Sequence, residues 1–195
     1  MGYDDIINSL HGDYCRFLER PNVRKQAVMP RSFVKTWIGS IAYPIWTSLS
    51  RKEEDEFPYY KAWEDKFWTL GPNLRTLIAS YVIGNSEKML GLVKKTYEAN
   101  IAMQILFPEV IPVNFKKTKW NTQNLCIQRD TDYTESTFEA AGIGGASTSR
   151  HYDQIIEDDL IYAKKDDFTG QELMPSQEDI DKAIGWHKLA TSLLV

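Results

Sequence analysis

A lysine and a threonine at the start of a predicted helix constrain the fold of this chain more than any other feature. Lys35 and Thr36 follow a tight loop at Pro30–Val34, and the apolar segment before the loop, Gln26–Met29, is predicted to be a short buried strand. Apolar residues then recur at helical spacing as far as Trp46, which predicts a helix that packs on a sheet. A strand, a loop and a helix in this order predict an α/β fold with the loop at one edge of the sheet.

This arrangement is the structural context of a phosphate-binding loop. The unpaired N–H groups at a helix start and the positive end of its dipole favour a polyanion. Lys35 would add a positive charge near the β- and γ-phosphates, and the hydroxyl of Thr36 would bind Mg²⁺. The usual pattern has glycine six residues before the lysine and directly before it, where this chain has Met29 and Val34. Because Val34 is β-branched, a left-handed backbone would be unfavourable there, and an ordinary turn with a solvated lysine stays an alternative.

Adjacent aspartates follow a second apolar segment late in the chain. Ile155 and Ile156 precede Glu157, Asp158 and Asp159. A buried strand that ends here would place the aspartates at the carboxyl edge of the sheet, where open α/β sheets bind ligands. One carboxylate can hold Mg²⁺ through water, and the next can orient an attacking water. A solvated acidic turn is the alternative, but the loop and the aspartates together predict an ATP site.

Four stretches of the sequence carry a resemblance to a known family. They are Pro30–Thr36 (PRSFVKT), Arg75–Ser80 with the helix and Phe107-Pro108-Glu109 that follow, Thr137–Asp153, and Ile155–Leu160 (IIEDDL). In order, these are similar to the divergent Walker A loop, the second strand and helix, the approach to Walker B, and Walker B itself in the large terminase subunit of tailed bacteriophages. That protein is the motor that packs DNA into the prohead, and the resemblance covers its ATPase part.

The resemblance implies a fold and a function. The fold would be a P-loop NTPase of the ASCE or RecA-like type, a three-layer α/β sandwich with a mostly parallel sheet, and residues 1–195 would form one partial domain of it. The function would be hydrolysis of ATP to drive double-stranded DNA into the prohead, in the host cytoplasm. The partners would be the portal protein, the small terminase subunit and further copies of the chain in a ring.

The family continues with a coupling-motif strand and a nuclease domain that are not found in this sequence. The chain is therefore expected to be a fragment, truncated before the coupling strand, or one piece of a split gene. Nuclease activity is not expected of it.

The resemblance also implies roles for individual residues. Thr36 and Asp158 would hold Mg²⁺, the aspartate through water, and Asp159 would orient the attacking water. Arg31 would contact the γ-phosphate, and Arg150 is a candidate for stabilising transition-state charge, in its own site or in a neighbour's. The ATP-binding loop itself would comprise Arg31, Ser32, Phe33, Val34, Lys35 and Thr36.

Two other functions stay open at this stage. The chain could be a nucleotide-binding or assembly module that does not hydrolyse ATP, since Val34 replaces a glycine and no coupling strand is found. A cellular helicase-like ATPase is a further alternative, although motifs that couple to a single strand are not visible.

Composition restricts the partners only in part. The net charge of −4 gives no overall basic field for nucleic acid, but the basic cluster Lys116–Lys119 beside Trp120 could contact a DNA backbone; a solvated loop is the alternative. Cys15 and Cys126 have no motif spacing, which predicts a reduced cytosolic protein. No apolar run approaches the roughly 20 residues of a membrane span.

Several elements are predicted from periodicity and capping. Helices are expected at Met1–Glu19, from Asn85 or Ser86 to Pro108, and after Ser176. In the first of these, Tyr14 or Phe17 could stack on adenine. A further helix is expected within Ser50–Pro72, as an insertion. Pro44 is expected to end or kink the helix that follows the loop. Strands are expected at Leu74–Ser80, Leu125–Arg129 and Ser136–Ile143.

Overall fold

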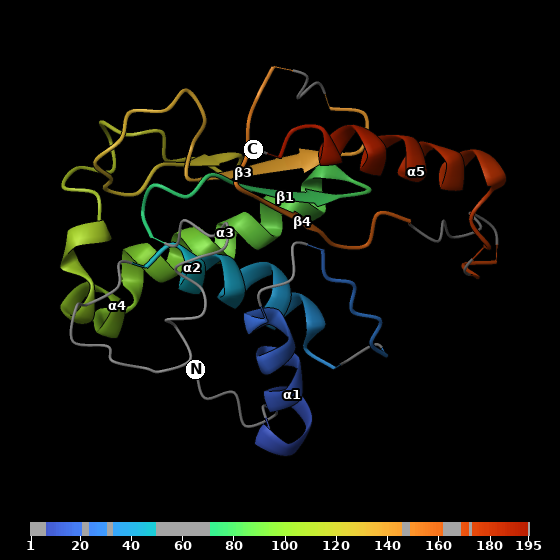
Figure 1. Ribbon diagram of the computed structural model, residues 1–195, viewed down its shortest axis with the longest axis horizontal. Coiled ribbons are helices and arrows are strands. Elements are labelled where there is room, and N and C mark those ends of the chain that lie inside the picture. Colours follow the sequence, from blue (N-terminus) through green and yellow to red (C-terminus); the bar gives the residue numbers. More distant parts are fainter. Residues whose placement is uncertain are drawn as a thin grey trace.

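A computed structural model of the chain is shown in Figure 1. It describes residues 7–20, 24–30, 33–49, 71–145, 149–161, 169–171 and 173–194. Two predicted residues of the phosphate loop, Arg31 and Ser32, lie outside the described residues, as do residues 50–70 of the predicted insertion within Ser50–Pro72. Among the described residues, no helix is both long and apolar enough to cross a membrane.

The described residues form an α/β fold around a four-stranded mixed sheet. The strands are β1 (Thr76–Ser80), β2 (Asn124–Leu125), β3 (Phe138–Gly142) and β4 (Gln154–Glu157), and their order is β2-β3-β1-β4. β1 is parallel to both β3 and β4, whereas β2 is antiparallel to β3. The prediction of an α/β fold with a mostly parallel sheet is confirmed.

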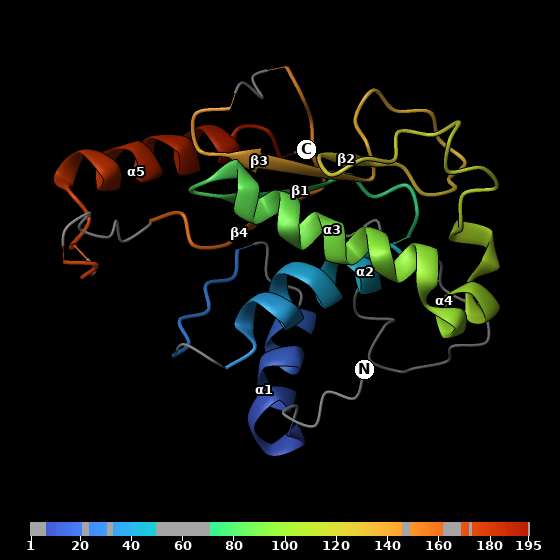
Figure 2. The ribbon, with the colours of Figure 1, turned by 180° about the vertical axis from the view of Figure 1, so that it is seen from behind.

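Helices cover both faces of the sheet (Figures 1 and 2). α3 (Ile83–Ala99) packs on one face, together with a helix made of the π-helical stretch η1 (Trp37–Ala42) and α2 (Tyr43–Thr47). α5 (Gln177–Thr191) packs on the other face through Trp186. α1 (Asn8–Glu19) lies beyond the η1–α2 helix, on the side away from the sheet.

β1 is buried along its whole length because it has a strand on each side and helices on both faces. Ile78 points toward α3 and Leu77 toward α5, as the alternation of side chains in a strand requires. At its carboxyl end the neighbouring strand has Gly142, where a Cβ atom would lie 2.9 Å from the backbone nitrogen of Ile83. A glycine here lets α3 begin directly against the sheet.

The predicted strand at Gln26–Met29 is wrong. Residues 24–30 are outside the described helices and strands, and Val28 is 88% exposed. An apolar run becomes a strand only where another strand offers it hydrogen-bonding groups. Here Lys25 ties the segment to helices instead, because its ammonium donates to the carbonyl of Leu18 and lies 3.3 Å from the hydroxyl of Tyr43.

Two other predicted elements have different bounds in the structure. The helix expected up to Pro108 is interrupted at Asn100, whose side chain accepts from Met103 N at 3.1 Å and begins a separate helix, α4 (Ile101–Leu106). The strand expected at Leu125–Arg129 is only β2, because Cys126 N already donates to a carbonyl in the preceding loop. The hydrophobic periodicity of the sequence gave no sign of either hydrogen bond.

The predicted start of α5 is confirmed in detail. Ser176 Oγ accepts from Asp179 N at 3.2 Å and donates to the Asp179 carboxylate at 2.7 Å. The same carboxylate accepts from Tyr81 Oη at 2.7 Å. Since Tyr81 directly follows β1, the N-terminus of α5 is attached to the carboxyl edge of the sheet.

Lys25 should make stability rise between pH 8 and pH 10. Burial lowers the pKa of Lys25 to about 8, whereas an unfolded lysine titrates near 10.4. In this interval the unfolded chain binds the proton more strongly, so the free energy of unfolding should rise with pH, by about 1 kcal/mol after allowance for solvent screening. Urea unfolding at pH 7.5 and 9.5 tests this. Lys25→Met should lack that rise, and an identical pH dependence in both proteins would contradict the prediction.

Candidate phosphate-binding site

The structure brings Lys35 and the two aspartates together. Lys35 Nζ lies 2.9 Å from Asp158 Oδ1 and 2.9 Å from Asp159 Oδ1. The aspartates directly follow β4, at the carboxyl edge of the sheet, and Lys35 begins the helix that leads into η1. Two segments more than 120 residues apart in the chain therefore meet at the predicted place.

The three side chains differ in their exposure to solvent. Asp158 is 3% exposed, Lys35 is 29% exposed and Asp159 is 67% exposed. Partial burial by itself would lower the pKa of Lys35, but the hydrogen bonds and charges of Asp158 and Asp159 outweigh it and raise the pKa to about 12. The lysine is therefore a permanent cation at neutral pH, with one deep and one superficial carboxylate beside it.

Val34 adopts the conformation that its β-branched side chain disfavours. Its φ angle is +56°, in the left-handed region, and its carbonyl accepts from Ile38 N at 3.0 Å to begin the helix. Left-handed backbone costs a non-glycine residue roughly 1–2 kcal/mol. The chain thus forms the turn that a glycine would form directly before the lysine, without having the glycine. Strain of this kind is concentrated at functional sites.

Replacing Val34 with glycine should change stability little. Relief of the left-handed strain, about 1–2 kcal/mol, should offset the lost packing and the larger unfolded-state freedom of glycine, so the free energy of unfolding should change by less than about 1 kcal/mol. Val93, fully buried inside α3, is the matched control, and Val93→Gly should cost about 3 kcal/mol or more. Equal losses in urea unfolding of the two variants would contradict this interpretation of the Val34 backbone.

Ser40 is part of the site, although the sequence pattern did not single it out. Its hydroxyl donates to Asp158 Oδ2 at 2.9 Å in a buried hydrogen bond. Thr36 was predicted to act with Asp158, but within the described part of the chain no hydrogen bond joins its hydroxyl to that carboxylate. Thr36 is half-buried in the first turn of the helix, and Phe33 is half-buried in the loop. The hydroxyl that contacts Asp158 is that of Ser40, one turn further along.

A second serine lies beside Asp158 on the neighbouring strand. β1 and β4 are in register from Thr76 to Ala79, and Asp158 N donates to Ala79 O at 2.9 Å, so the next residue of β1, Ser80, lies level with Asp158. Ser80 is fully buried, and its hydroxyl makes no hydrogen bond to any described residue. Buried hydroxyls without a partner are uncommon, and a bound water or ligand group would satisfy this one.

Tyr14 of α1 also reaches the site. Its hydroxyl lies so close to Gly39 that an added Cβ atom there would be 2.3 Å away. Burial raises the pKa of Tyr14, and the charge of Asp158 adds to this while Lys35 opposes it. The structure therefore places the Tyr14 ring against the helix after the loop, and its predicted role in stacking on adenine stays a prediction.

Arg150 lies away from the site within its own chain. It pairs with Glu139, whose register partner Leu77 packs on the α5 face of the sheet. Asp158 contacts Ser40 of η1, on the opposite face. The expectation that Arg150 acts in its own site is therefore not met. Because side chains alternate along β3, Glu139 and the arginine that pairs with it lie on the α5 face, away from Asp158. A role in a neighbouring subunit's site stays a prediction.

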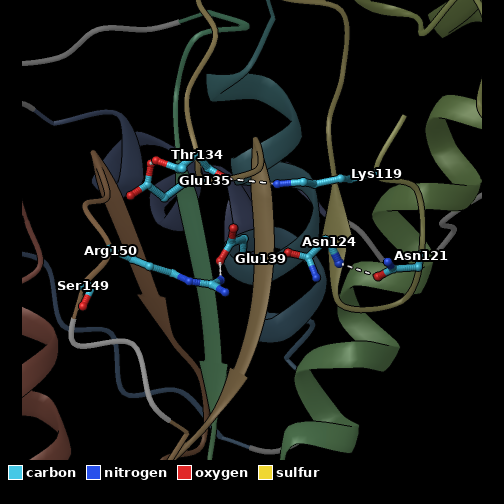
Figure 3. A pocket seen from close by; sticks show the side chains of 8 residues that line it. All are labelled: Lys119, Asn121, Asn124, Thr134, Glu135, Glu139, Ser149 and Arg150. Atoms are coloured by element: carbon cyan, nitrogen blue, oxygen red, sulfur yellow. Dashed lines mark hydrogen bonds and ion pairs between the residues drawn. The ribbon is translucent and has the colours of Figure 1, made fainter. Parts of the chain in front are cut away.

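Arg150 and Glu139 line a pocket of about 480 Å³. Figure 3 shows the Arg150 side chain pointing toward the Glu139 carboxylate. The carboxylate of Glu139 also accepts from Ser136 N at 2.8 Å and from Tyr152 Oη at 2.7 Å. The carboxylate of Glu135 accepts from His151 N at 2.9 Å. Both acids are thus engaged within the protein. The residues that line the pocket are Lys119, Asn121, Asn124, Thr134, Glu135, Glu139, Ser149 and Arg150.

The donor set at the Lys35 site fits a magnesium ion bound together with phosphate. Mg²⁺ prefers oxygen ligands and is commonly held by one or two carboxylates plus substrate phosphates and water. Asp158 supplies a carboxylate for the ion, Asp159 lies next to it, and Ser80, with its unpaired hydroxyl, is level with Asp158 on β1. The described residues contain no group of three or more His, Cys, Asp or Glu that could hold a metal, so the phosphates would have to complete the coordination.

The fold and the site together define an α/β protein with a lysine–aspartate site at the carboxyl edge of its sheet. Comparisons of the chain with protein-family models, curated proteins and solved structures give no match. Its function is therefore argued from the geometry of this site.

Proposed function

We propose that this chain binds MgATP at the Lys35 site as a P-loop NTPase. The observation that carries the proposal is the convergence of Lys35 with Asp158 and Asp159, each at 2.9 Å. The left-handed Val34 adds to it, since this residue stands where phosphate loops have glycine. Together they supply a loop, a fixed cation and two carboxylates at a sheet edge, which are the main parts of such a site.

The chain's own residues would act as follows. Lys35 would leave the aspartates and neutralise the β- and γ-phosphate oxygens, and the first N–H groups of the helix would donate hydrogen bonds to the phosphates. Asp159, the exposed carboxylate, would orient the attacking water. Arg31 remains the predicted contact of the γ-phosphate. Phosphoryl transfer depends mainly on positioning and charge neutralisation, so this set is sufficient for binding.

Asp158 and Thr36 would hold Mg²⁺, with Asp159 beside them. When bound, the ion would neutralise charge on the β- and γ-phosphates. Asp158 is suited to this position because it is buried and held at both oxygens, at Oδ1 by Lys35 and at Oδ2 by Ser40.

The larger assembly is proposed from the sequence resemblance to terminase large subunits. On that basis the chain is the ATPase part of a motor that moves double-stranded DNA into a prohead. Its partners would be the portal protein, the small terminase subunit and further copies of itself. Arg150, 49% exposed, would then be available to a neighbouring copy if it left Glu139.

Calorimetric titration with a non-hydrolysable ATP analogue and Mg²⁺ tests the proposal. We expect binding that Mg²⁺ strengthens and that EDTA weakens but does not abolish. Phosphate release from ATP, with and without double-stranded DNA, then tests turnover. Absence of analogue binding in the presence of Mg²⁺ would overturn the ATP-binding proposal.

A second candidate function is nucleotide binding or assembly without hydrolysis. Two observations favour it: Arg150 is bound to Glu139 away from the site, and the segment 24–30 before the loop is not part of the described sheet. Analogue binding without phosphate release, also in the presence of DNA, would support this candidate over the ATPase.

A further inference from the structure

Ser40 holds Asp158, the more buried of the two aspartates, from the interior of the protein. Ser40 is 4% exposed and Asp158 is 3% exposed, so water does not compete for their 2.9 Å hydrogen bond. A hydroxyl that donates to a carboxylate makes a stronger bond than a neutral pair does. The bond occupies Oδ2, whereas Lys35 occupies Oδ1. The two oxygens of Asp158 thus have separate partners, one internal and one at the site.

The π-helical stretch explains how Lys35 and Ser40 reach the same carboxylate. An α-helix has 3.6 residues per turn, so residues five apart point about 140° away from each other. In η1 the hydrogen bonds run from residue i to i+5, as between Ile38 O and Tyr43 N, and residues five apart come to the same side. Lys35 and Ser40 are five residues apart; Lys35 lies two residues before this stretch and Ser40 lies within it.

Pro44 gives a reason for the π-helical stretch. Proline has no N–H, so Pro44 cannot donate to the carbonyl four residues earlier, which is that of Ser40, and its ring crowds that carbonyl in an α-helix. The helix does not end at Pro44, as the sequence had suggested it could, but widens before it and continues as α2. The wider turn accommodates the proline and directs Ser40 toward Asp158.

We infer that Ser40 is a positioning residue for the metal site, an inference that rests on the proposed function. It keeps Oδ2 of Asp158 turned inward, so that Oδ1 faces the phosphates when Lys35 moves to them. Without the Ser40 hydroxyl, the carboxylate can turn toward Ser80, which is level with Asp158 on β1 and has an unpaired, buried hydroxyl. Oδ1 would then no longer be held where the hydrated ion is expected.

Ser40→Ala, compared with Ser48→Ala, tests this inference. Ser48 is a matched control because it too is buried, lies next to the C-terminus of α2, and donates no bond to the site; its hydroxyl is 2.6 Å from that of Tyr97. Affinity for a fluorescent, non-hydrolysable ATP analogue is measured as a function of Mg²⁺ concentration and again in EDTA. Urea unfolding of each variant reports stability separately.

Ser40→Ala should raise the Mg²⁺ concentration needed for half-maximal binding about tenfold, the usual effect of removing a group that orients a metal ligand. Its affinity in EDTA should stay within about twofold of wild type, because Ser40 does not touch the phosphates. Ser48→Ala should lose stability without changing the Mg²⁺ dependence.

The other possible outcomes distinguish failure of the inference about Ser40 from failure of the proposed function. A Ser40→Ala protein with the wild-type Mg²⁺ dependence, or a Ser48→Ala protein with the same shift as Ser40→Ala, overturns the inference about Ser40 alone. A wild-type chain that binds the analogue equally well with and without Mg²⁺ overturns it as well, while leaving nucleotide binding in place. A wild-type chain that does not bind the analogue under either condition overturns the proposed function and the inference together.

Discussion

Replacing Lys35 with alanine is expected to reduce the affinity for MgATP by at least about 100-fold. Loss of one partner of a buried, hydrogen-bonded charge pair costs about 2–5 kcal/mol in binding, and about 2.8 kcal/mol corresponds to 100-fold. The geometry adds a second effect. Lys35 offsets one of the two negative charges of Asp158 and Asp159, and without it both carboxylates would repel the incoming phosphates.

The same substitution should lower the stability of the protein without ligand. Asp158 is 3% exposed and would lose its ammonium partner, keeping only the Ser40 hydroxyl. Removing one partner of a buried ion pair typically costs about 3–5 kcal/mol, and the 29% exposure of Lys35 should bring the loss to about 2 kcal/mol.

Calorimetric titration and urea unfolding check the two effects, with Lys182→Ala as the control. Lys182 forms an exposed ion pair with Glu178 on α5, so its removal should leave both binding and stability close to wild type. Unchanged analogue affinity in Lys35→Ala would contradict the assignment of the phosphate loop, whatever the effect on stability.

Asp159→Asn is expected to keep MgATP binding and to lose hydrolysis by about 100- to 10,000-fold, the usual contribution of a group that acts on the attacking water. Asp159 is 67% exposed and touches Lys35 only from the solvent side, so asparagine can take its place without repacking. Asp158 would still hold its position through Ser40. The substitution removes a negative charge near the phosphates, so affinity should be unchanged or slightly higher.

Single-turnover phosphate release separates this effect from product release. Asp181→Asn is the matched control, since Asp181 is an exposed aspartate on α5 that accepts a hydrogen bond from Gln177 at 2.9 Å. It should hydrolyse ATP at the wild-type rate. If Asp159→Asn released phosphate as fast as wild type, the attacking water would have to be oriented by another residue.

The chemical pair at the centre of the site could be predicted from the sequence. A lysine at a helix start and aspartates at a strand end each have a fixed local context, and α/β topology brings the carboxyl ends of strands and the starts of helices to one edge. Lys35 and Asp158 accordingly meet at 2.9 Å. The start of α5 was predictable for a similar reason, since the Ser176–Asp179 cap is a contact between residues close in sequence.

The partners of that pair could not be predicted. Ser40 contacts Asp158 only because Pro44 shifts the helix into π-helical winding, and helical periodicity assumes 3.6 residues per turn. A proline within a helical pattern was the one signal that could have indicated altered winding. Ser80 lies beside Asp158 only through the register of β1 and β4, which no local pattern contains.

Two residue-level expectations failed, one on the face of the sheet that a side chain occupies and one on a backbone conformation. Arg150 was grouped with the site because it is close in sequence to the aspartates, yet Glu139 holds it on the α5 face. Val34 was expected to avoid the left-handed conformation, yet it has a φ angle of +56°. The start of the helix and the contacts of the loop outweigh a local preference of roughly 1–2 kcal/mol.

The sequence by itself thus determined the α/β class, the places of three strands and of α5, and the chemistry of the lysine and the aspartates. These follow from hydrophobic periodicity and capping, which act over a few residues. Only the tertiary structure decided that residues 24–30 stay outside the sheet, that Ser40 and Ser80 join Asp158, and that Arg150 does not. Those outcomes depend on register and on which face packs against which helix, and both are set by contacts between segments far apart in the chain.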